Sequence, residues 1–185
     1  MKKYYELGPF TIFDVETTGM SAVNDRIVEI AALRVDLNGD ISRFQTLVNP
    51  DRHIPSGVSR VHHIFDDMVM DAPHFRQVGY DFLKFAKNST LVAHNARFDL
   101  AFLQESLARN GLPLWQGRTM DSIVLLKKSH AGLPSYSLQN LRAHFRLDEI
   151  MPEMQAHRAG ADVEWTHKLF EISLCELLRC ECEEE

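Results

Sequence analysis

Three strand-like runs lie within the first fifty residues, and they limit the folds open to this chain. Residues 10–15 and 26–35 are rich in β-branched and aromatic side chains, which favour strands that enter a core. Asn38-Gly39 then favours a tight hairpin turn into a third run at residues 41–48. The pattern predicts a sheet that begins with three strands, the second and third joined as a hairpin.

The remaining sequence is expected to add one strand and several helices. Residues 49–66 contain two prolines and a glycine and are predicted as a loop with short turns. Asp71 is expected to cap a helix that has Pro73 in its first turn. Further elements are predicted as a strand at 90–93 and helices at 98–110, 121–128, 137–145 and 159–180. This order predicts one α/β domain over residues 1–185, with a core at about 8–175 and a mixed sheet.

Composition and charge narrow the class of protein. The 185 residues carry a formal net charge of −6, which argues against broad electrostatic binding to nucleic acid. Carboxylates that hold cations would still allow local binding. The sequence has no apolar stretch of the ~18 residues that a membrane span requires. Its three cysteines lie near the C-terminus, and their odd number argues against a disulfide framework and favours a reducing cytoplasm. A cytoplasmic protein without a membrane partner is therefore expected.

Two acids interrupt the first strand-like run where it ends. Asp14 and Glu16 are two residues apart, so on a strand their side chains project from the same face, with Cα atoms ~6.6 Å apart. Two unpaired carboxylates this close repel each other, and burial would raise the pKa of at least one. A divalent cation such as Mg²⁺ binds carboxylate oxygens and would remove the repulsion. An Asp-x-Glu sequence also arises by chance, so the pair alone does not define a site.

Two further acids and a histidine occupy comparable places. Asp99 follows the predicted strand at 90–93 and opens the next helix, where it could equally complement the helix N-terminus. Asp162 lies near the start of the last helix, and the same alternative applies to it. His157 precedes Asp162 by five residues, so the two would share no helical face, but a histidine placed before the helix can fold over the site. A lone histidine in such a place is usually structural.

Three sequence strings contain these residues: FDVETTG at 13–19, HNARFD at 94–99 and HRAGAD at 157–162. In this order they resemble the three motifs of the DEDDh, or DnaQ-like, 3′–5′ exonucleases, and the resemblance spans residues 10–170. It implies an α/β ribonuclease H-like fold with a central mixed five-stranded sheet flanked by helices. Four strands are predicted from the residues, and a fifth is expected near 118–120.

The resemblance implies a metal-dependent site. It assigns Asp14, Glu16, Asp99 and Asp162 as ligands of two divalent cations, Mg²⁺ or Mn²⁺, and His157 as the general base. Two such cations can activate water and stabilise the leaving oxygen of a phosphodiester, and an imidazole can take the proton of the attacking water. The His-x4-Asp spacing matches the histidine branch of the family, since no tyrosine lies between residues 151 and 162.

The resemblance also implies a pocket for the 3′-terminal nucleotide. The turn after Glu16 would line it, with a glycine that allows close backbone approach. A second segment usually reads His-Gly-Ile in the family, and this chain has His63 in place of the glycine. The ring of Phe98 could stack on a base or belong to the core. The implied substrate-binding residues are Thr17, Thr18, Gly19, Met20, Val61, His62, Asn95 and Phe98.

The predicted function is a metal-dependent 3′–5′ exonuclease that releases nucleoside monophosphates from the 3′ end of DNA in proofreading or repair. The expected partner is nucleic acid with a free 3′ end, preferably single-stranded or frayed DNA, and a polymerase or a helicase is considered as a protein partner. An exoribonuclease, a non-catalytic binding module of the same fold, and an unrelated two-metal phosphatase or endonuclease are the alternatives. The intact set of four acids and a histidine argues against the binding module.

Overall fold

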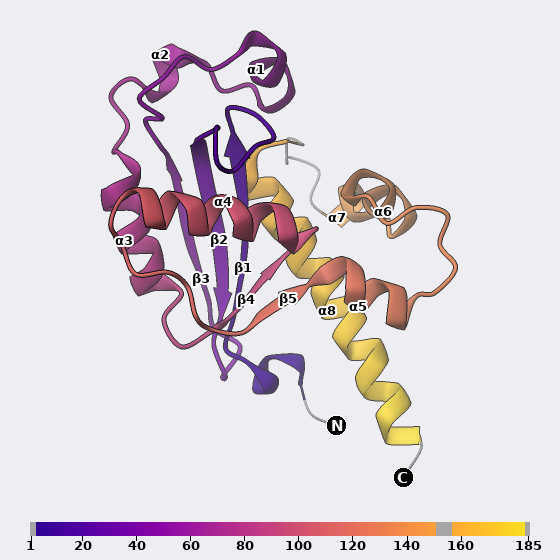
Figure 1. Ribbon diagram of the computed structural model, residues 1–185. Coiled ribbons are helices and arrows are strands. Elements are labelled where there is room, and N and C mark those ends of the chain that lie inside the picture. Colours follow the sequence, from indigo (N-terminus) through magenta and orange to yellow (C-terminus); the bar gives the residue numbers. More distant parts are fainter. Residues whose placement is uncertain (1–2, 151–156, 184–185) are drawn as a thin grey trace.

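A five-stranded mixed sheet forms the centre of the computed structural model, which describes residues 3–150 and 157–183 (Figure 1). The spatial order is β3-β2-β1-β4-β5. The strands are β1 (Phe10–Thr17), β2 (Ile27–Val35), β3 (Ile41–Leu47), β4 (Thr90–Ala93) and β5 (Thr119–Asp121). The first three pair antiparallel, whereas β4 is parallel to β1 and β5 to β4. The predicted α/β fold and its five-stranded mixed sheet are confirmed, including a fifth strand close to its expected position.

Helices cover both faces of this sheet (Figure 1). One face carries α3 (Phe75–Phe85) and α4 (Ala96–Arg109); the other carries the long helix α8 (Ala159–Glu183), beside α5 (Ser122–Ser129) and α6 (Leu138–His144). The shorter elements are η1 (Tyr4–Leu7), α1 (Ser56–His62), α2 (Asp66–Val69) and α7 (Leu147–Ile150). Among the described helices, none is long and apolar enough to cross a lipid bilayer. On α8, Cys175 is a free thiol, and the side chains of Cys180 and Cys182 lie outside the described residues.

Successive side chains of β1 point to opposite faces of the sheet, and this alternation decides which layer of helices each of them faces. Phe13 and Val15 lie in the core formed with α3 and α4, whereas Phe10 and Ile12 lie in the core formed with α8. Because side chains two residues apart share a face, the two acids of this strand continue the row of Phe10 and Ile12. The acids therefore end the strand on the face where the last helix begins.

The segment between β3 and α3 contains more helix than the sequence predicts. The loop expected at residues 49–66 contains α1 and the first residue of α2. Ile54 and Ile64 pack with Val69 against Val28 of β2, and all four are almost fully buried. Burial of these apolar side chains stabilises two short helices in a stretch that its prolines and glycine mark as a loop.

The helix expected to begin at Asp71 begins later. Its N-cap is His74, which has an extended backbone and makes no capping hydrogen bond with its side chain. Tertiary pairing holds the preceding residues extended, because the Asn49 N–H donates to the Pro73 carbonyl and Asn49 forms an isolated bridge with His74. This pairing overrides the local capping signal of Asp71.

Candidate active site

Three carboxylates meet where β1 ends and α8 begins. Asp14 and Glu16 belong to β1, and Asp162 belongs to the first turn of α8. One carboxylate oxygen from each residue lies within 4.8 Å of those of the other two. A β-bulge between Glu16 and Thr17 shifts the register with β2 at this point, and bulges often re-aim side chains next to active sites. The group is compact enough for one cation to bind all three acids.

The fourth predicted ligand, Asp99, enters from the first turn of α4 and is buried. Its Oδ1 accepts a hydrogen bond of 3.1 Å from the backbone N–H of Val15, the residue between the two acids of β1. Burial, and after it the charge of Asp99, raises the pKa of Asp14, so the two carboxylates are close neighbours. Asp99 nevertheless lies outside the group within 4.8 Å. It borders the other three acids, and its role as a metal ligand stays a prediction.

All four acids have raised pKa values, and burial is the main cause. It raises the pKa of Asp14 well above its usual range, and it raises the pKa of Glu16 to about 8 together with the charge of Asp162. Burial likewise raises the pKa of Asp99 to about 8, and that of Asp162 to about 7 against the opposing charge of Arg142.

The donor set fits the metal site that the resemblance implies. The Oδ1 atom of Asp162 is buried and has no hydrogen-bond partner in the described part of the chain. Its neighbours Asp14 and Glu16 offer further carboxylate oxygens, which are the ligands preferred by hard divalent cations. A cation would satisfy the orphaned oxygen and offset both the burial and the mutual repulsion that disfavour the charged forms of these acids.

His157 lies just before α8, as the sequence predicts, and its side chain is exposed. Its backbone has a φ of 57°, a left-handed conformation that is uncommon outside glycine and often found at functional sites. The ring Nε2 lies 3.5 Å from the side-chain nitrogen of Gln139 on α6. Burial dominates the pKa of Asp162, but a hydrogen bond with the His157 backbone opposes it, so the histidine adjoins the acidic group. Its role as a general base stays a prediction.

Glu29 of β2 is a component of this region that the sequence reasoning missed. It pairs with Glu16 across the two strands and is 1% exposed. Arg158 donates to its carboxylate from Nε and Nη2, at 3.1 and 2.9 Å, and the Ala159 N–H donates at 3.2 Å. The signal for it was a single acidic residue within the mostly apolar run RIVEIAALRV, but Arg158 and Ala159, which bind it, follow about 130 positions later.

The turn after β1 is closed by its own side chains. Thr17 Oγ1 donates to the Gly19 carbonyl at 2.6 Å, and Thr18 Oγ1 donates to Asp25 at 3.3 Å. Asp25 also accepts a hydrogen bond of 2.9 Å from the Ser21 N–H. A Cβ atom at Gly19 would lie 2.4 Å from the Asp25 carboxylate, so a larger residue here would displace Asp25 from its hydrogen bonds. Asp25 therefore organises the turn, although an aspartate in a polar loop is not a distinctive sequence signal.

His62 supports this turn from α1. It is 2% exposed, and its Nδ1 accepts a hydrogen bond from the Ile64 N–H. In the neutral ring the proton is then on Nε2, which donates to the Thr17 carbonyl at 3.3 Å. His63 has a φ of 58°, a left-handed conformation that glycine would adopt without strain. The nearby Val61 is 49% exposed.

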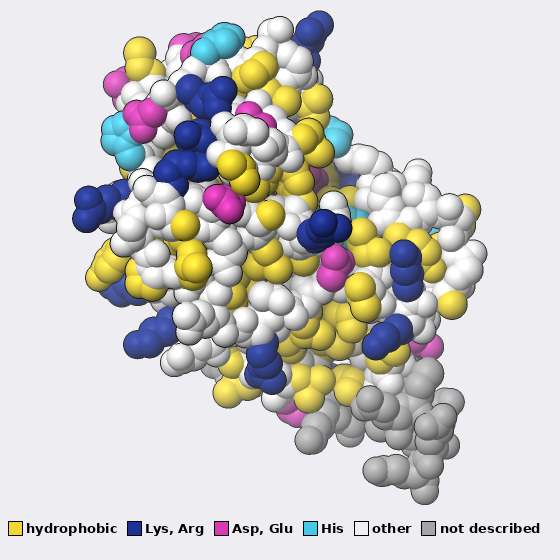
Figure 2. Space-filling model, in the orientation of Figure 1, with side chains coloured by type: hydrophobic (Ala, Val, Ile, Leu, Met, Phe, Trp, Pro, Cys, Tyr) yellow, Lys and Arg dark blue, Asp and Glu magenta, His cyan; other side chains and the backbone are white. Residues whose placement is uncertain are grey.

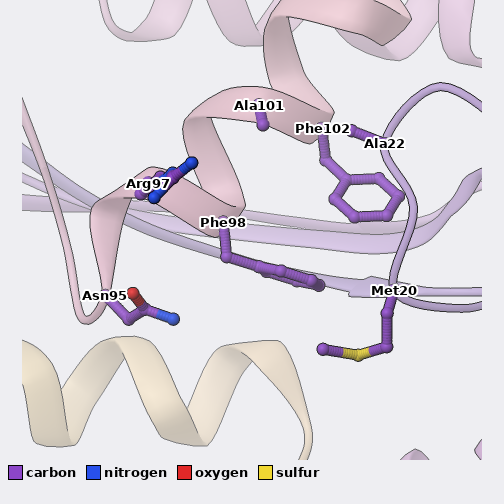
Figure 3. A pocket seen from close by; sticks show the side chains of 7 residues that line it. All are labelled: Met20, Ala22, Asn95, Arg97, Phe98, Ala101 and Phe102. Atoms are coloured by element: carbon purple, nitrogen blue, oxygen red, sulfur yellow. The ribbon is translucent and has the colours of Figure 1, made fainter.

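A cavity of about 320 Å³ lies between this turn and α4 (Figure 3). Its wall contains Met20, Asn95 and Phe98, and the ring of Phe98 extends toward Met20. The remaining lining residues are Ala22, Arg97, Ala101 and Phe102. The volume is within the range of small-molecule sites, and the wall is apolar with a few polar groups. Of the predicted substrate residues, Met20, Asn95 and Phe98 line this cavity. Thr17, Thr18 and His62 are buried and shape the turn together with Gly19, and Val61 is exposed outside both groups.

Comparison with known proteins agrees with this geometry. The RNase_T model, which describes an exonuclease family, matches residues 11–170. The DNA polymerase III subunit epsilon of Treponema pallidum is 42% identical over 163 residues, which are 87% of this chain and 74% of that protein. The PolC-type DNA polymerase III of Caldanaerobacter subterraneus is 36% identical over 172 residues, which are 93% of this chain but 12% of that protein.

Solved structures give the same result. Exonuclease X in complex with 5′-overhanging duplex DNA has a TM-score of 0.68 and 30% identity, covering 90% of this chain and 91% of that one. Escherichia coli exonuclease I in complex with a dA16 oligonucleotide has a TM-score of 0.73 and 20% identity, covering 92% of this chain and 40% of that one, and supports the fold alone. Fold and site together define a nuclease with the expected ribonuclease H-like architecture. The chain belongs to the RNase_T exonuclease family and is a DnaQ-like 3′–5′ exonuclease.

Proposed function

We propose that this exonuclease degrades DNA from the 3′ end with two divalent cations, Mg²⁺ or Mn²⁺, held by Asp14, Glu16, Asp99 and Asp162. The observation that carries the proposal is the convergence of three mutually repelling carboxylates within 4.8 Å at the end of β1. Bound cations supply the positive charge that neutralises the acids and stabilises the reacting phosphate. DNA in the exonuclease X complex, together with the identity to a DNA polymerase III subunit, supports DNA as the substrate.

In the proposed reaction, the His157 imidazole accepts a proton from the water that attacks the terminal phosphodiester. A bond forms between the water oxygen and phosphorus, and the bond from phosphorus to the 3′ oxygen of the preceding nucleotide breaks. That oxygen takes up a proton, and the products are a nucleoside 5′-monophosphate and a strand with a new 3′ hydroxyl. The exposed position of His157 at the start of α8 leaves its ring accessible to water.

The closed turn at Thr17–Gly19 supports recognition of a strand end. Its hydroxyls are occupied by internal hydrogen bonds with the Gly19 carbonyl and Asp25. The adjoining cavity at Met20, Asn95 and Phe98 has an apolar wall suited to a base or a sugar. A free 3′ hydroxyl would fit beside Glu16, whereas a 3′ phosphate would bring further negative charge against it.

We also propose the cellular setting. The epsilon and PolC-type relatives carry the names of DNA polymerase III components, which supports a polymerase as partner, a role in proofreading or repair, and a cytoplasmic location. A helicase partner and the organisation of residues 1–185 as one exonuclease domain, with its core at about 8–175, stay predictions.

Labelled oligonucleotides test the proposed activity. The protein is incubated with single-stranded DNA that carries either a 3′ hydroxyl or a 3′ phosphate, with the same sequence as a circle, and with the matching RNA. Two duplexes, one with a paired and one with a mismatched 3′ end, complete the set. With Mg²⁺ or Mn²⁺ we expect monophosphates to be released one at a time from the free 3′ hydroxyl, faster from mismatched than from paired ends. The circle should survive, and the 3′ phosphate should slow degradation strongly. Nicking of the circle would contradict end recognition, and faster degradation of RNA would identify an exoribonuclease.

A further inference from the structure

We propose that the buried Glu29–Arg158 ion pair is a positioning device that holds His157 and Asp162 in register with the end of β1. The pair itself touches no reacting atom. The inference rests on the proposed function, because it concerns how this chain places its general base and one of its metal ligands.

Several hydrogen bonds fix the geometry of the Glu29–Arg158 pair. The two oxygens of Glu29 accept the Nε and Nη2 hydrogen bonds of Arg158, at 3.1 and 2.9 Å, in a bidentate arrangement. The same carboxylate accepts the Ala159 N–H and the side-chain amide of Gln45, at 3.2 and 2.9 Å. Four donors thus fix one carboxylate, and three of them belong to Arg158 and Ala159, the two residues that directly follow His157.

This geometry controls the backbone of His157. Its φ of 57° is a conformation that a residue other than glycine adopts only when its surroundings impose it. The side chain is exposed and lies 3.5 Å from Gln139, a distance too long for a strong hydrogen bond. Arg158 and Ala159 anchor the chain immediately after the histidine, so the direction of the imidazole depends on the Glu29 carboxylate.

The same anchor reaches Asp162. The Asp162 N–H donates at 3.1 Å to the Arg158 carbonyl, one turn earlier in the chain. A shift of Arg158 would therefore move the start of α8 and the carboxylate that completes the group with Asp14 and Glu16. Gly160 allows this close docking, because a Cβ atom there would lie 2.6 Å from the Gln45 amide oxygen.

Charge complementarity supports the assignment. Glu29 pairs across the strands with Glu16 and is 1% exposed, so an unpaired charge at this position would add to the repulsion among the site acids. Arg158, whose side chain is 28% exposed, supplies the matching charge from the α8 side. The ion pair thus joins β2 to the start of α8 without any contribution from the cations of the site.

The variant Glu29→Gln keeps the shape of the side chain and removes its charge. We expect kcat on a 3′-labelled single-stranded oligodeoxynucleotide to fall about 10–100-fold, as for residues that orient metal ligands, with KM changed less than about twofold. Affinity for Mn²⁺ alone, measured by calorimetry without DNA, should weaken several-fold through Asp162. In a His157→Ala background at saturating Mn²⁺, adding Glu29→Gln should lower kcat by less than about threefold, because the residue it positions is gone.

Two further variants separate positioning from mere stability. Glu29→Gln with Arg158→Met removes both charges, so it should recover thermal stability without recovering kcat. Arg43→Gln is the matched control, since it breaks an ion pair between the sheet and Glu164 of the same helix at an exposed position. Recovery of kcat together with stability, or a full loss from Glu29→Gln in the His157→Ala background, would overturn the proposal. A wild-type protein that binds Mn²⁺ but leaves DNA intact would instead reject the proposed function.

Discussion

Glu16 and Glu29 pair across two adjacent strands, yet the protein treats their charges in opposite ways. Burial raises the pKa of Glu29, but the hydrogen bonds from Arg158 and Gln45 outweigh it, and the pKa lies below its usual value. Burial and the charge of Asp162 raise the pKa of Glu16 to about 8. Glu29 is neutralised by a cationic side chain of the protein, Arg158, and this ion pair joins the sheet to the helix. No side chain neutralises Glu16 to the same extent, so its carboxylate is available to bind an added metal cation.

The largest expected effect comes from removing one of the uncompensated acids. Asp14→Asn should lower exonuclease activity by roughly 10³-fold, because it removes a ligand from the charge that stabilises the reacting phosphate. The folded protein should be at least as stable as wild type without metal, since one member of a repelling set is gone. Single-turnover rates in Mn²⁺ and thermal unfolding in EDTA measure the two quantities.

Chelation is the matching control, because EDTA should abolish activity in wild type and added Mg²⁺ should restore it. Cleavage that continues in excess EDTA would show that the acids serve another purpose. An Asp14→Asn protein that unfolds would show that Asp14 is mainly structural.

His157→Ala should have the next largest effect, lowering kcat by about 10²–10³-fold. Affinity for Mn²⁺, measured by calorimetry without DNA, should be largely retained, because the imidazole is proposed to accept a proton and not to bind the cations. His144→Ala, at an exposed histidine that ends α6, is the control and should behave as wild type. A His157→Ala protein with the kcat of wild type would assign the base to another group.

The meeting of Asp14, Glu16 and Asp162 could be anticipated because its signals are local in sequence. Strand alternation places the first two on one face, and the strings around Asp99 and Asp162 carry the family resemblance, while the roles of Asp99 and His157 stay predictions. Glu29 could not be assigned, since its partner Arg158 approaches only after the chain has built the sheet and returned through α8.

The fold, too, could be predicted where the signal is local in sequence and could not be predicted where tertiary contacts decide the structure. The hairpin at Asn38-Gly39 was predicted correctly because its turn signal is local: β2 and β3 are joined by residues 36–40, and Gly39 has the positive φ of 87° that this connection requires. The N-cap at Asp71 was wrong because pairing between Asn49 and His74 decides where α3 begins. Short helices at residues 49–66 depend on burial against β2, which no local window contains.

A smaller effect concerns stability without metal, and its sign follows from the raised pKa of Glu16. Because the folded pKa of about 8 exceeds the usual 4.5, the contribution of this group to stability is fully present below pH 4.5 and is lost as the pH rises toward 8. Glu16→Gln should therefore match wild type near pH 4.5 in EDTA and unfold at a higher temperature at pH 8. A gain of ~1–2 kcal/mol corresponds to about 2–8 °C for a domain of this size.

Calorimetry in EDTA across this pH range measures the difference, with Glu105→Gln at an exposed site of α4 as the control. Added Mn²⁺ should reverse the order at pH 8, because the wild type binds the ion more tightly and gains more stability from it. A Glu16→Gln protein that is less stable than wild type at pH 8 in EDTA would contradict the comparison with Glu29.

The smallest expected effect tests how closely α8 docks on the Glu29 side. Gly57 and Gly160 are each the second residue of a helix, but a Cβ atom at Gly57 meets nothing within 4 Å, whereas one at Gly160 would lie 2.6 Å from the Gln45 amide oxygen. Gly57→Ala should raise the free energy of unfolding by about 0.5–1 kcal/mol. Gly160→Ala should gain the same amount but displace Gln45 from Glu29, at a cost of about 0.5–1.5 kcal/mol, so its net change should be close to zero. In a Gln45→Ala background the amide that would collide with the new Cβ atom is absent. Gly160→Ala should then stabilise the protein as much as Gly57→Ala does. Equal gains at both glycines in the wild-type background, measured by urea unfolding, would show that α8 docks on the sheet less tightly than Glu29 requires.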